Sequence, residues 1–229
     1  QIIRESNETA GPNSSGPAIA FDLDEAGVVG LGRAGRGEVA LPVPGLGDVP
    51  LRLERIHVLA PRAELVTTGD GGSAPYSTDL MIFRGTSADA PGTWAVLGLS
   101  KDRIVGSIHT EGGSWAILTP ELSPESGGRH LIWDEGNTTP ALDATCGVDD
   151  DAARWPDLQD MRQRAEARAV TSADRLVCRV ALEADNDIYV GTFGSDLNAT
   201  TNYLLTLMAT VSAMYERDVN VTLEVIYLS

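Results

Sequence analysis

The sequence predicts an α+β fold in which an antiparallel, β-rich front part precedes an incomplete α/β unit. Three observations support this. Between about residues 27 and 135, short apolar runs alternate with turn sequences. Residues 175–229 read instead as strand, long helix and strand, and residues 136–174, of different composition, separate the two parts. Because strands and helices are segregated along the chain, we expect two units joined by a connector.

The first 26 residues are polar and rich in Gly, Pro, Ser and Asn. Such a segment has too little apolar surface to bury, so the sequence predicts a mobile N-terminal arm over residues 1–26.

The front part, residues 27–135, carries the strand signal. The stretch "VPLRLERIHVLA" alternates apolar and polar residues. The turn sequences "SADAPG", "SKDR" and "TEGG" then separate the apolar runs 80–83, 94–99, 104–108 and 114–118, and "GRHLIWDEG" offers a further strand. Short strands at close, even spacing predict an antiparallel meander.

Residues 136–174 are dominated by Asp, Ala and Arg and contain few apolar residues. We interpret them as a connector that proteases can reach around Arg162, Arg164 and Arg168. A solvated surface helix within one continuous domain is the alternative interpretation.

The back part, residues 175–229, predicts a βαβ unit. "RLVCRVALEAD" has the low charge of a buried strand, and "VTLEVIYL" alternates as a second strand that would pair with it in parallel. The helix "NATTNYLLTLMATVSAMYERDVN" would begin at Ser195, Asp196, Asn198 or Thr200 and end at Asn220. Its apolar stripe, expected to face the core, is Tyr203, Leu204, Leu207, Met208, Val211, Met214 and Tyr215. One βαβ unit cannot cover both faces of its sheet, so either the front part covers it or the chain is a fragment.

The charge balance excludes two classes of partner. The chain has 33 acidic and 17 basic residues, a formal net charge of −16. Nucleic acids and anionic membrane surfaces both need clustered Lys and Arg. The sequence contains no apolar run long enough for a membrane segment.

Known catalytic motifs are absent from the 229 residues. There is no H-E-x-x-H, C-x-x-C or G-x-S-x-G pattern. The histidines His57, His109 and His130 are far apart in the sequence. Acidic clusters are compatible with weak calcium binding, but none has the spacing of a calcium loop, so a solvated acidic surface is the better interpretation.

The stretch "TPALDATCGVDDD" places Cys146, one of only two cysteines, in a polar, turn-rich segment. One interpretation is a disulfide with Cys178, which would close a loop of roughly thirty residues and stabilise the fold by about 3–4 kcal/mol. Against it, Cys178 belongs to the strand expected to be buried. The other interpretation is a thiolate that binds a metal held elsewhere. The local residues alone favour the disulfide slightly.

A family resemblance favours the metal-binding interpretation of Cys146 over the disulfide. "VALEADNDIYVGTFGSDLNATTNYLLTLMATVSAMYERDVNVTLEVIYL" resembles the opening of the catalytic domain in reprolysin-type (adamalysin, ADAM-like) zinc metalloproteases, above all in "AMYERDVNVTLEVIYL". "FRGTSADAPGTWAVLGLSKDRIVGSIHTEGGSWAILTPE" resembles the prodomain of that family, and "TCGV" resembles its cysteine-switch phrase. The resemblance covers roughly residues 50 to 229.

The resemblance implies a role for each part. Residues 27–135 would be the prodomain, residues 136–174 a connector with the cysteine switch, and residues 175–229 the first βαβ unit of a metzincin-like catalytic domain. Cys146 would be the fourth, inhibitory ligand of the catalytic zinc, and Gly147 would let the backbone pass close to the cleft. Activation would follow cleavage near Arg162, Arg164 or Arg168. Calcium is a possible second ion, with Glu183 and Asp185 as distant candidate ligands.

The implied function is the N-terminal part of a secreted zinc metalloendopeptidase zymogen. Its partners would be its own catalytic domain and protein or peptide substrates. The zinc motif and the Met-turn of the family are missing from these residues, so no catalytic residue is assigned, and Thr145 stands where a basic residue usually precedes the cysteine. The alternative is a non-enzymatic, secreted, β-rich binding or inhibitory module with a Cys146–Cys178 disulfide.

Overall fold

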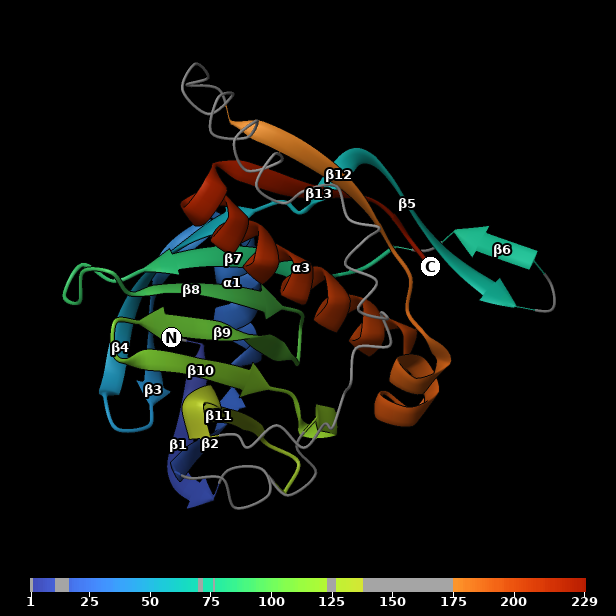
Figure 1. Cartoon of the computed structure of the whole chain (residues 1–229). Helices are drawn as coiled ribbons and strands as arrows, with labels where there is room; N and C mark the ends of the chain where they lie inside the picture. Colours follow the sequence, from blue (N-terminus) through green and yellow to red (C-terminus); the bar gives the residue numbers. More distant parts are fainter. Residues whose placement is uncertain (1, 11–16, 70–71, 76, 123–126, 138–174) are drawn as a thin grey trace, which may run out of the picture.

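The fold is β-rich and mostly antiparallel. The computed structural model describes residues 2–10, 17–69, 72–75, 77–122, 127–137 and 175–229. Within these residues the larger sheet has nine strands in the order β1-β2-β11-β10-β9-β8-β7-β4-β3 (Figure 1). Its strands are β1 (Ile3–Ala10), β2 (Pro17–Leu23), β3 (Arg36–Val43), β4 (Gly47–Ile56), β7 (Met81–Thr86), β8 (Trp94–Leu99), β9 (Ile104–Thr110), β10 (Gly113–Leu118) and β11 (His130–Asp134).

This sheet curls into a near-barrel. All of its neighbouring strands pair antiparallel, and the edge strands β1 and β3 approach each other. The helix α1 (Glu25–Ala34) connects β2 to β3, with Asp24 as its N-cap and Gly35 in the left-handed conformation at its C-terminal end. Two short 3₁₀ turns, η2 (Pro120–Leu122) and η4 (Glu135–Asn137), follow β10 and β11. One core fills the inside of the barrel and includes Phe21, Leu53, Phe83, Leu97 and Ile108.

The predicted meander is confirmed, and the predicted arm is wrong where the structure describes it. Strands β7 to β11 follow one another in both the chain and the sheet. Residues 3–10 and 17–23, expected in a mobile arm, are instead strands of the barrel. Although the segment is polar overall, Ile2, Ile3 and Phe21 are buried in the barrel core and hold it there.

A second, four-stranded sheet combines the front and back parts of the chain. Its order is β12-β13-β5-β6, where β12 (Leu176–Leu182) and β13 (Val221–Leu228) pair in parallel as predicted. The third strand, β5 (Leu59–Gly69), comes from the front part and also runs parallel to β13. The strand β6 (Gly72–Pro75) completes the sheet as an antiparallel hairpin with β5.

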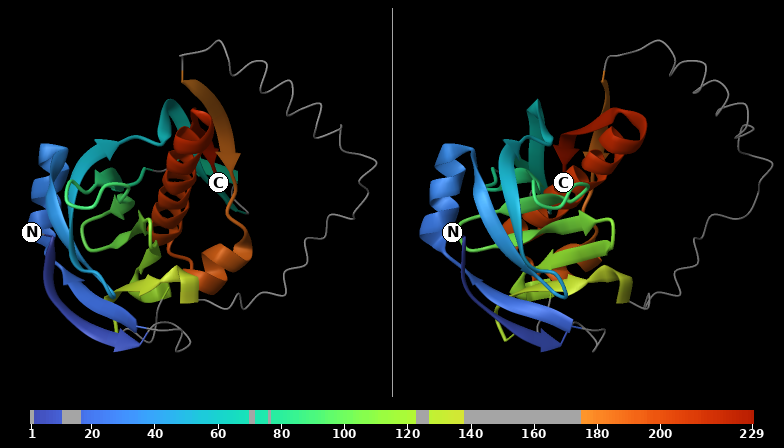
Figure 2. Two further views of the ribbon diagram at one scale, coloured as in Figure 1. Left: turned by 60° about the vertical axis from the view of Figure 1, so that its left-hand side comes forward. Right: turned by 90° about the vertical axis from the view of Figure 1, so that its left-hand side faces the viewer.

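The helix α3 (Leu197–Val219) lies between the small sheet and the outer face of the barrel (Figure 2). Asp196 is its N-cap and Asn220, in the left-handed conformation, ends it, as the sequence predicts. A short π-helical turn, η5 (Asp187–Thr192), connects β12 to α3. Around α3 a second core forms from residues of both parts: Val58, Leu65, Ile82, Val96, Leu205, Ala209, Ala213, Val225 and Leu228. The front and back parts therefore share one core.

Candidate functional site

The residues predicted to control latency lie outside the part of the chain that the structure describes. Cys146, Gly147, Arg162, Arg164 and Arg168 all fall within residues 138–174. The inhibitory zinc ligand, its supporting glycine and the activation cleavage sites therefore stay predictions. The structure shows instead the surfaces that flank this segment.

The candidate calcium ligands follow β12. Glu183 and Asp185 are exposed, and Asp185 Oδ1 accepts a hydrogen bond from the backbone N–H of Ile188 at 2.8 Å. This bond lies just before and within the first residues of the turn η5 (Asp187–Thr192), so Asp185 has a local structural role. Among the described residues, no three His, Cys, Asp or Glu side chains form a group able to hold a metal ion.

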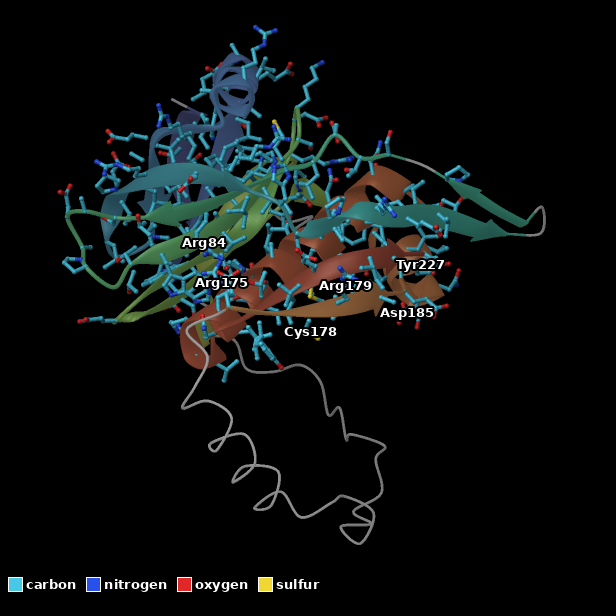
Figure 3. All side chains as sticks on the ribbon, turned by 90° about the horizontal axis from the view of Figure 1, so that it is seen from above. Arg84, Arg175, Cys178, Arg179, Asp185 and Tyr227 are labelled. Carbon is cyan, nitrogen blue, oxygen red and sulfur yellow. The ribbon has the colours of Figure 1, made fainter. Side chains whose placement is uncertain are left out.

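The other cysteine, Cys178, has a free and exposed thiol (Figure 3). The sequence predicts a buried strand here, and this prediction is wrong. In the small sheet β12 is an edge strand, and α3 packs against β13. As a result, residues 175–179 are all exposed, including Leu176 (59%) and Val177 (53%).

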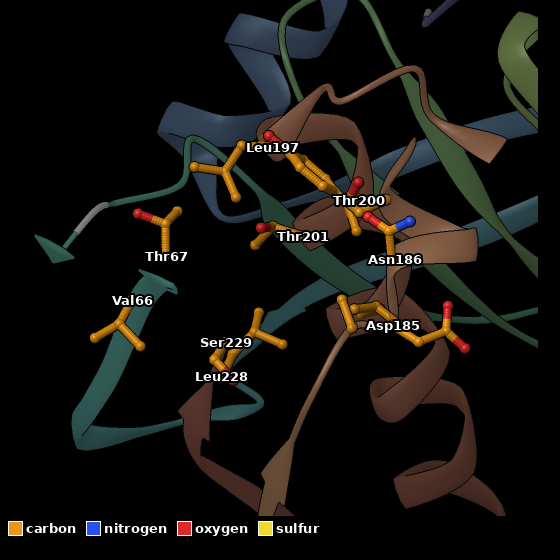
Figure 4. Close-up of a pocket in the computed structure, with 12 residues that line it drawn as sticks. Val66, Thr67, Asp185, Asn186, Leu197, Thr200, Thr201, Leu228 and Ser229 are labelled. Atoms are coloured by element: carbon orange, nitrogen blue, oxygen red, sulfur yellow. The ribbon is translucent and has the colours of Figure 1, made fainter. Parts of the chain in front are cut away.

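A cavity of about 240 Å³ lies where β12, β13 and β5 end, beside the start of α3 (Figure 4). Because these three strands are parallel, their carboxyl ends meet at one edge of the sheet. This is the position at which open α/β sheets bind ligands. Its polar lining includes Thr67, Asp185, Asn186, Thr200 and Thr201.

The two parts also approach each other closely at Gly98 of β8. A Cβ added at Gly98 would lie 1.8 Å from Thr206 Oγ1 and 3.1 Å from Leu80 Cδ1. The absence of a side chain therefore lets α3 approach the outer face of the barrel closely. Thr206 is buried, and its hydroxyl donates a hydrogen bond to the carbonyl of Asn202 in the preceding helical turn.

The buried face of α3 differs from the predicted one. Leu207 and Tyr215, expected in the core, are 47% and 49% exposed. The residues that face the barrel and the small sheet are mostly small: Ala199, Thr200, Thr201, Asn202, Leu205, Thr206, Ala209, Thr210, Ser212 and Ala213. Small residues permit close packing, and the hydroxyls of Thr200, Thr206 and Thr210 each donate to a backbone carbonyl one helical turn earlier, so these three groups are buried with a partner. Thr and Ala recur at helical spacing along this face, and this pattern, unlike the apolar stripe, indicates the buried side of α3.

Polar contacts tie both ends of α3 to the front part. Arg103 donates to Asp196 at 2.8 Å at the start of the helix. Near the other end, Glu216 Oε2 lies 2.8 Å from Arg84 of β7 and 3.4 Å from Arg175. Because the side chain of Glu216 is only 9% exposed, these two cations neutralise a nearly buried carboxylate. Arg175 is the first described residue after position 174, so this cluster lies where the described back part begins (Figure 3).

An aromatic cluster lies at the same end of the helix. The rings of Trp94 and His109 stack with centroids 3.9 Å apart, and the guanidinium of Arg217 lies 5.7 Å from the Trp94 ring centroid. His109 Nε2 is 2.9 Å from Ser107 Oγ. Burial, and secondly the positive charge of Arg217, lower the pKa of His109. Both effects disfavour protonation of His109 at the contact between the barrel and α3.

The other two histidines lie outside the cluster of Trp94, His109 and Arg217. His57 is exposed, whereas His130 is buried in the barrel, stacks on Phe21 and accepts a hydrogen bond from the Ile104 N–H at 3.3 Å. The three histidines thus occupy separate places, as their sequence positions suggested.

The geometry defines a barrel that carries a docked βαβ unit. No protein-family model matches the chain, and no curated protein matches it. No helix among the described residues is both long enough and apolar enough to cross a membrane.

Proposed function

We propose that this chain is the N-terminal part of a secreted zinc metalloendopeptidase zymogen, in which residues 175–229 begin the catalytic domain. On this proposal the fold is α+β, and the barrel is the prodomain of a metzincin-like enzyme. The support is the order of features along the chain: a β-rich unit, a segment with the "TCGV" phrase, and a βαβ unit with the "AMYERDVN" phrase.

The observation that carries the proposal is the state of β12. Strands of parallel sheets are normally buried on both faces. In the described residues β12 has one bare edge, and Leu176 and Val177, which point to opposite faces, are both exposed. A further strand and further packing elements are expected to cover such a strand. This is consistent with a βαβ unit that opens a larger α/β domain.

The barrel side of the unit is already covered. The edge of β13 pairs with β5, and the buried face of α3 lies on β8 and β9. The front part therefore occupies one side of the βαβ unit and leaves the β12 side open for the rest of a catalytic domain. A prodomain would be expected to bind its protease in this one-sided manner.

The test uses the precursor that contains these residues. Replacing Cys146 with Ala should allow hydrolysis of a quenched fluorescent peptide before processing, because the inhibitory thiolate is lost and water can bind the zinc. Cys178→Ala is the matched control and should stay as latent as the wild type. A zinc chelator should abolish the activity that Cys146→Ala releases.

Two results would overturn the proposal. One is equal latency of Cys146→Ala and the wild type. The other is a precursor whose complete sequence contains no H-E-x-x-H motif.

A second candidate, a secreted binding or inhibitory module, is favoured by the shared core, because the back part packs onto the barrel as a structural layer. That alternative expects a Cys146–Cys178 disulfide, whereas the Cys178 thiol is free in the structure. Thiol titration of the unfolded, unreduced chain separates the two. Two free thiols support the zymogen, and none supports the module.

A further inference from the structure

We propose that the barrel and the βαβ unit remain bound to each other when the connector between them is cut. The inferred interaction surface consists of the outer face of β8 and β9 together with the parallel edge of β5. The partner that fits this surface is a βαβ unit. Its helix presents a face of small residues to β8 and β9, and its second strand has an edge free to pair with β5. The association itself does not depend on the proposed function. Only its regulatory consequence does.

The first support is the core between the two parts. Val58, Leu65, Ile82 and Val96 come from the front part, and Leu205, Ala209, Ala213, Val225 and Leu228 come from the back part. All nine side chains are buried, and they belong to one cluster. Separating the parts would expose both sets to water, at a cost of roughly 25 cal/mol per Å² of apolar surface.

The second support is backbone pairing. Strand β13 hydrogen-bonds to the front part, since the N–H of Val225 donates to the carbonyl of Val58 at 2.8 Å, and the pairing reaches Leu65 and Leu228. A strand added to an exposed edge binds through its main chain as well as its side chains. This explains why β5 leaves the barrel and extends along the small sheet (Figure 1).

The third support is the set of polar contacts across the interface. Arg103–Asp196, Arg84–Glu216 and the hydrogen bond from Thr78 to Asn202, at 2.7 Å, join residues on opposite sides of the connector. Asn202 is 4% exposed. Separation would leave its side chain and that of Glu216 without these partners, so partial opening is unfavourable.

The consequence for a zymogen is that cutting the connector does not by itself release the prodomain. A second event must separate the barrel from α3 and β13. Activation would then have two stages, cleavage and dissociation, and the second would be set by the interface described above.

The experiment cuts the full chain. A recognition sequence for a site-specific protease replaces part of residues 150–160, and the cut protein is passed through a size-exclusion column at low micromolar concentration. We expect both fragments to elute in one peak with the mass of the uncut chain. Elution as two separate fragments would overturn the proposal.

A point variant tests the surface itself. Gly98→Ala places a methyl group 1.8 Å from Thr206 Oγ1, so either the Thr206 hydroxyl must turn away from its hydrogen bond to Asn202 or α3 must move away from β8. We expect the dissociation constant of the cut fragments to rise by about tenfold or more, which corresponds to ~1.4 kcal/mol. Adding Thr206→Ala should restore part of the affinity, because it removes the clashing hydroxyl. Unchanged affinity in Gly98→Ala would contradict the assigned surface.

The control is Gly30→Ala on α1, where an added Cβ meets nothing within 4 Å. It should leave the association unchanged. If Gly98→Ala does not fold, the cut wild-type chain still decides the question. The outcome is also independent of the latency test, since fragments that separate would leave the result for Cys146→Ala untouched.

Discussion

Asp196 stabilises the start of α3 in two ways. Its Oδ1 accepts the N–H of Ala199 at 2.9 Å, and its Oδ2 pairs with Arg103 at 2.8 Å. Burial acts to raise the pKa of Asp196, but the hydrogen bonds from Ala199 and Arg103 outweigh it, so the pKa is lowered. The stabilisation from Asp196 is therefore present above the unfolded pKa and is lost as the pH falls through the folded pKa.

Replacing Asp196 separates the two contributions. Asp196→Ala should lower the free energy of unfolding by about 1–2 kcal/mol, because the N-cap is lost. Asp196→Asn keeps an acceptor for the cap and removes the charge, so it should cost only about 0.2–1 kcal/mol. Urea denaturation at neutral pH measures both. An Asp196→Ala protein as stable as the wild type would show that the cap contributes nothing.

His109 makes the fold sensitive to mild acid. Its pKa is lowered in the folded protein, so the unfolded chain binds a proton more readily and stability falls as the pH drops below the ordinary value of 6.5. The groups that face its ring are Trp94, Ser107 and Arg217.

His109→Phe should keep the stacking on Trp94 and remove the titration. We expect the loss of unfolding free energy between pH 7 and pH 5, values that bracket the ordinary His pKa of about 6.5, to be smaller in this variant than in the wild type. Chemical denaturation at the two pH values measures the difference. An equal loss in both proteins would contradict a role for His109, since other titrating groups are common to the two.

At the scale of elements, β8 and β9 depend on a glycine. A Cβ at Gly106 would lie 2.1 Å from the carbonyl oxygen of Val96 on the neighbouring strand. Gly106→Ala should destabilise the protein by about 2–3 kcal/mol, because backbone cannot move aside as a flexible side chain can. Thermal or urea unfolding measures this. Gly112→Ala, whose nearest neighbour would be 3.7 Å away, is the control and should be close to neutral.

The unpaired edge of β12 can be tested with a charged substitution. Val177→Lys should leave the unfolding free energy within about 0.5 kcal/mol of the wild type, since the side chain is exposed. The same change should reduce self-association at high concentration, because a charge on an edge strand opposes pairing with another chain. Light scattering and urea denaturation measure the two effects. Val180→Lys, which alters a half-buried residue packed on the shared core, should destabilise instead.

Elements with local signals were predictable from the sequence. Turn residues between short apolar runs predicted the positions of β7 to β11. Capping residues predicted the ends of α3 to within one or two positions. The apolar stripe of α3 did not predict which face of the helix is buried. That face contacts Gly98, which lies more than a hundred residues before Thr206 in the chain. The exposure of β12 was not predicted, because an apolar run indicates a strand suited to burial but does not show whether another element covers it.

The pairing of β5 with β13 and the strands in residues 3–23 were missed for a related reason. The partner of β5 in this pairing, β13, is distant in sequence, and so is β11, the strand that joins the β1–β2 pair to the rest of the barrel. No local pattern encodes either pairing. Of the candidate site, the sequence supplied Cys146 and its surroundings, which lie outside the described residues. The contact surface on β8 and the cluster of Arg84, Arg175 and Glu216 required the fold.

At the scale of the whole molecule, the shared core predicts one cooperative unfolding transition. Tryptophan fluorescence reports on the barrel through Trp94, Trp115 and Trp133, and helical circular dichroism reports mainly on α3. Because the second core belongs to both parts, the two urea transitions should coincide. Two separated midpoints would show that the barrel and the βαβ unit unfold independently.

The parallel pairing of β5 with β13 also has a consequence during synthesis. Leu65 leaves the ribosome long before Leu228, its partner, has been made. N-terminal units generally fold first during translation, so the barrel would form while β5 still lacks its neighbour. Until β13 has been made, the nascent chain would then display an unpaired edge and the apolar outer face of β8. A chaperone that holds extended apolar segments would find its binding site there, until the last residues of β13 emerge and close it.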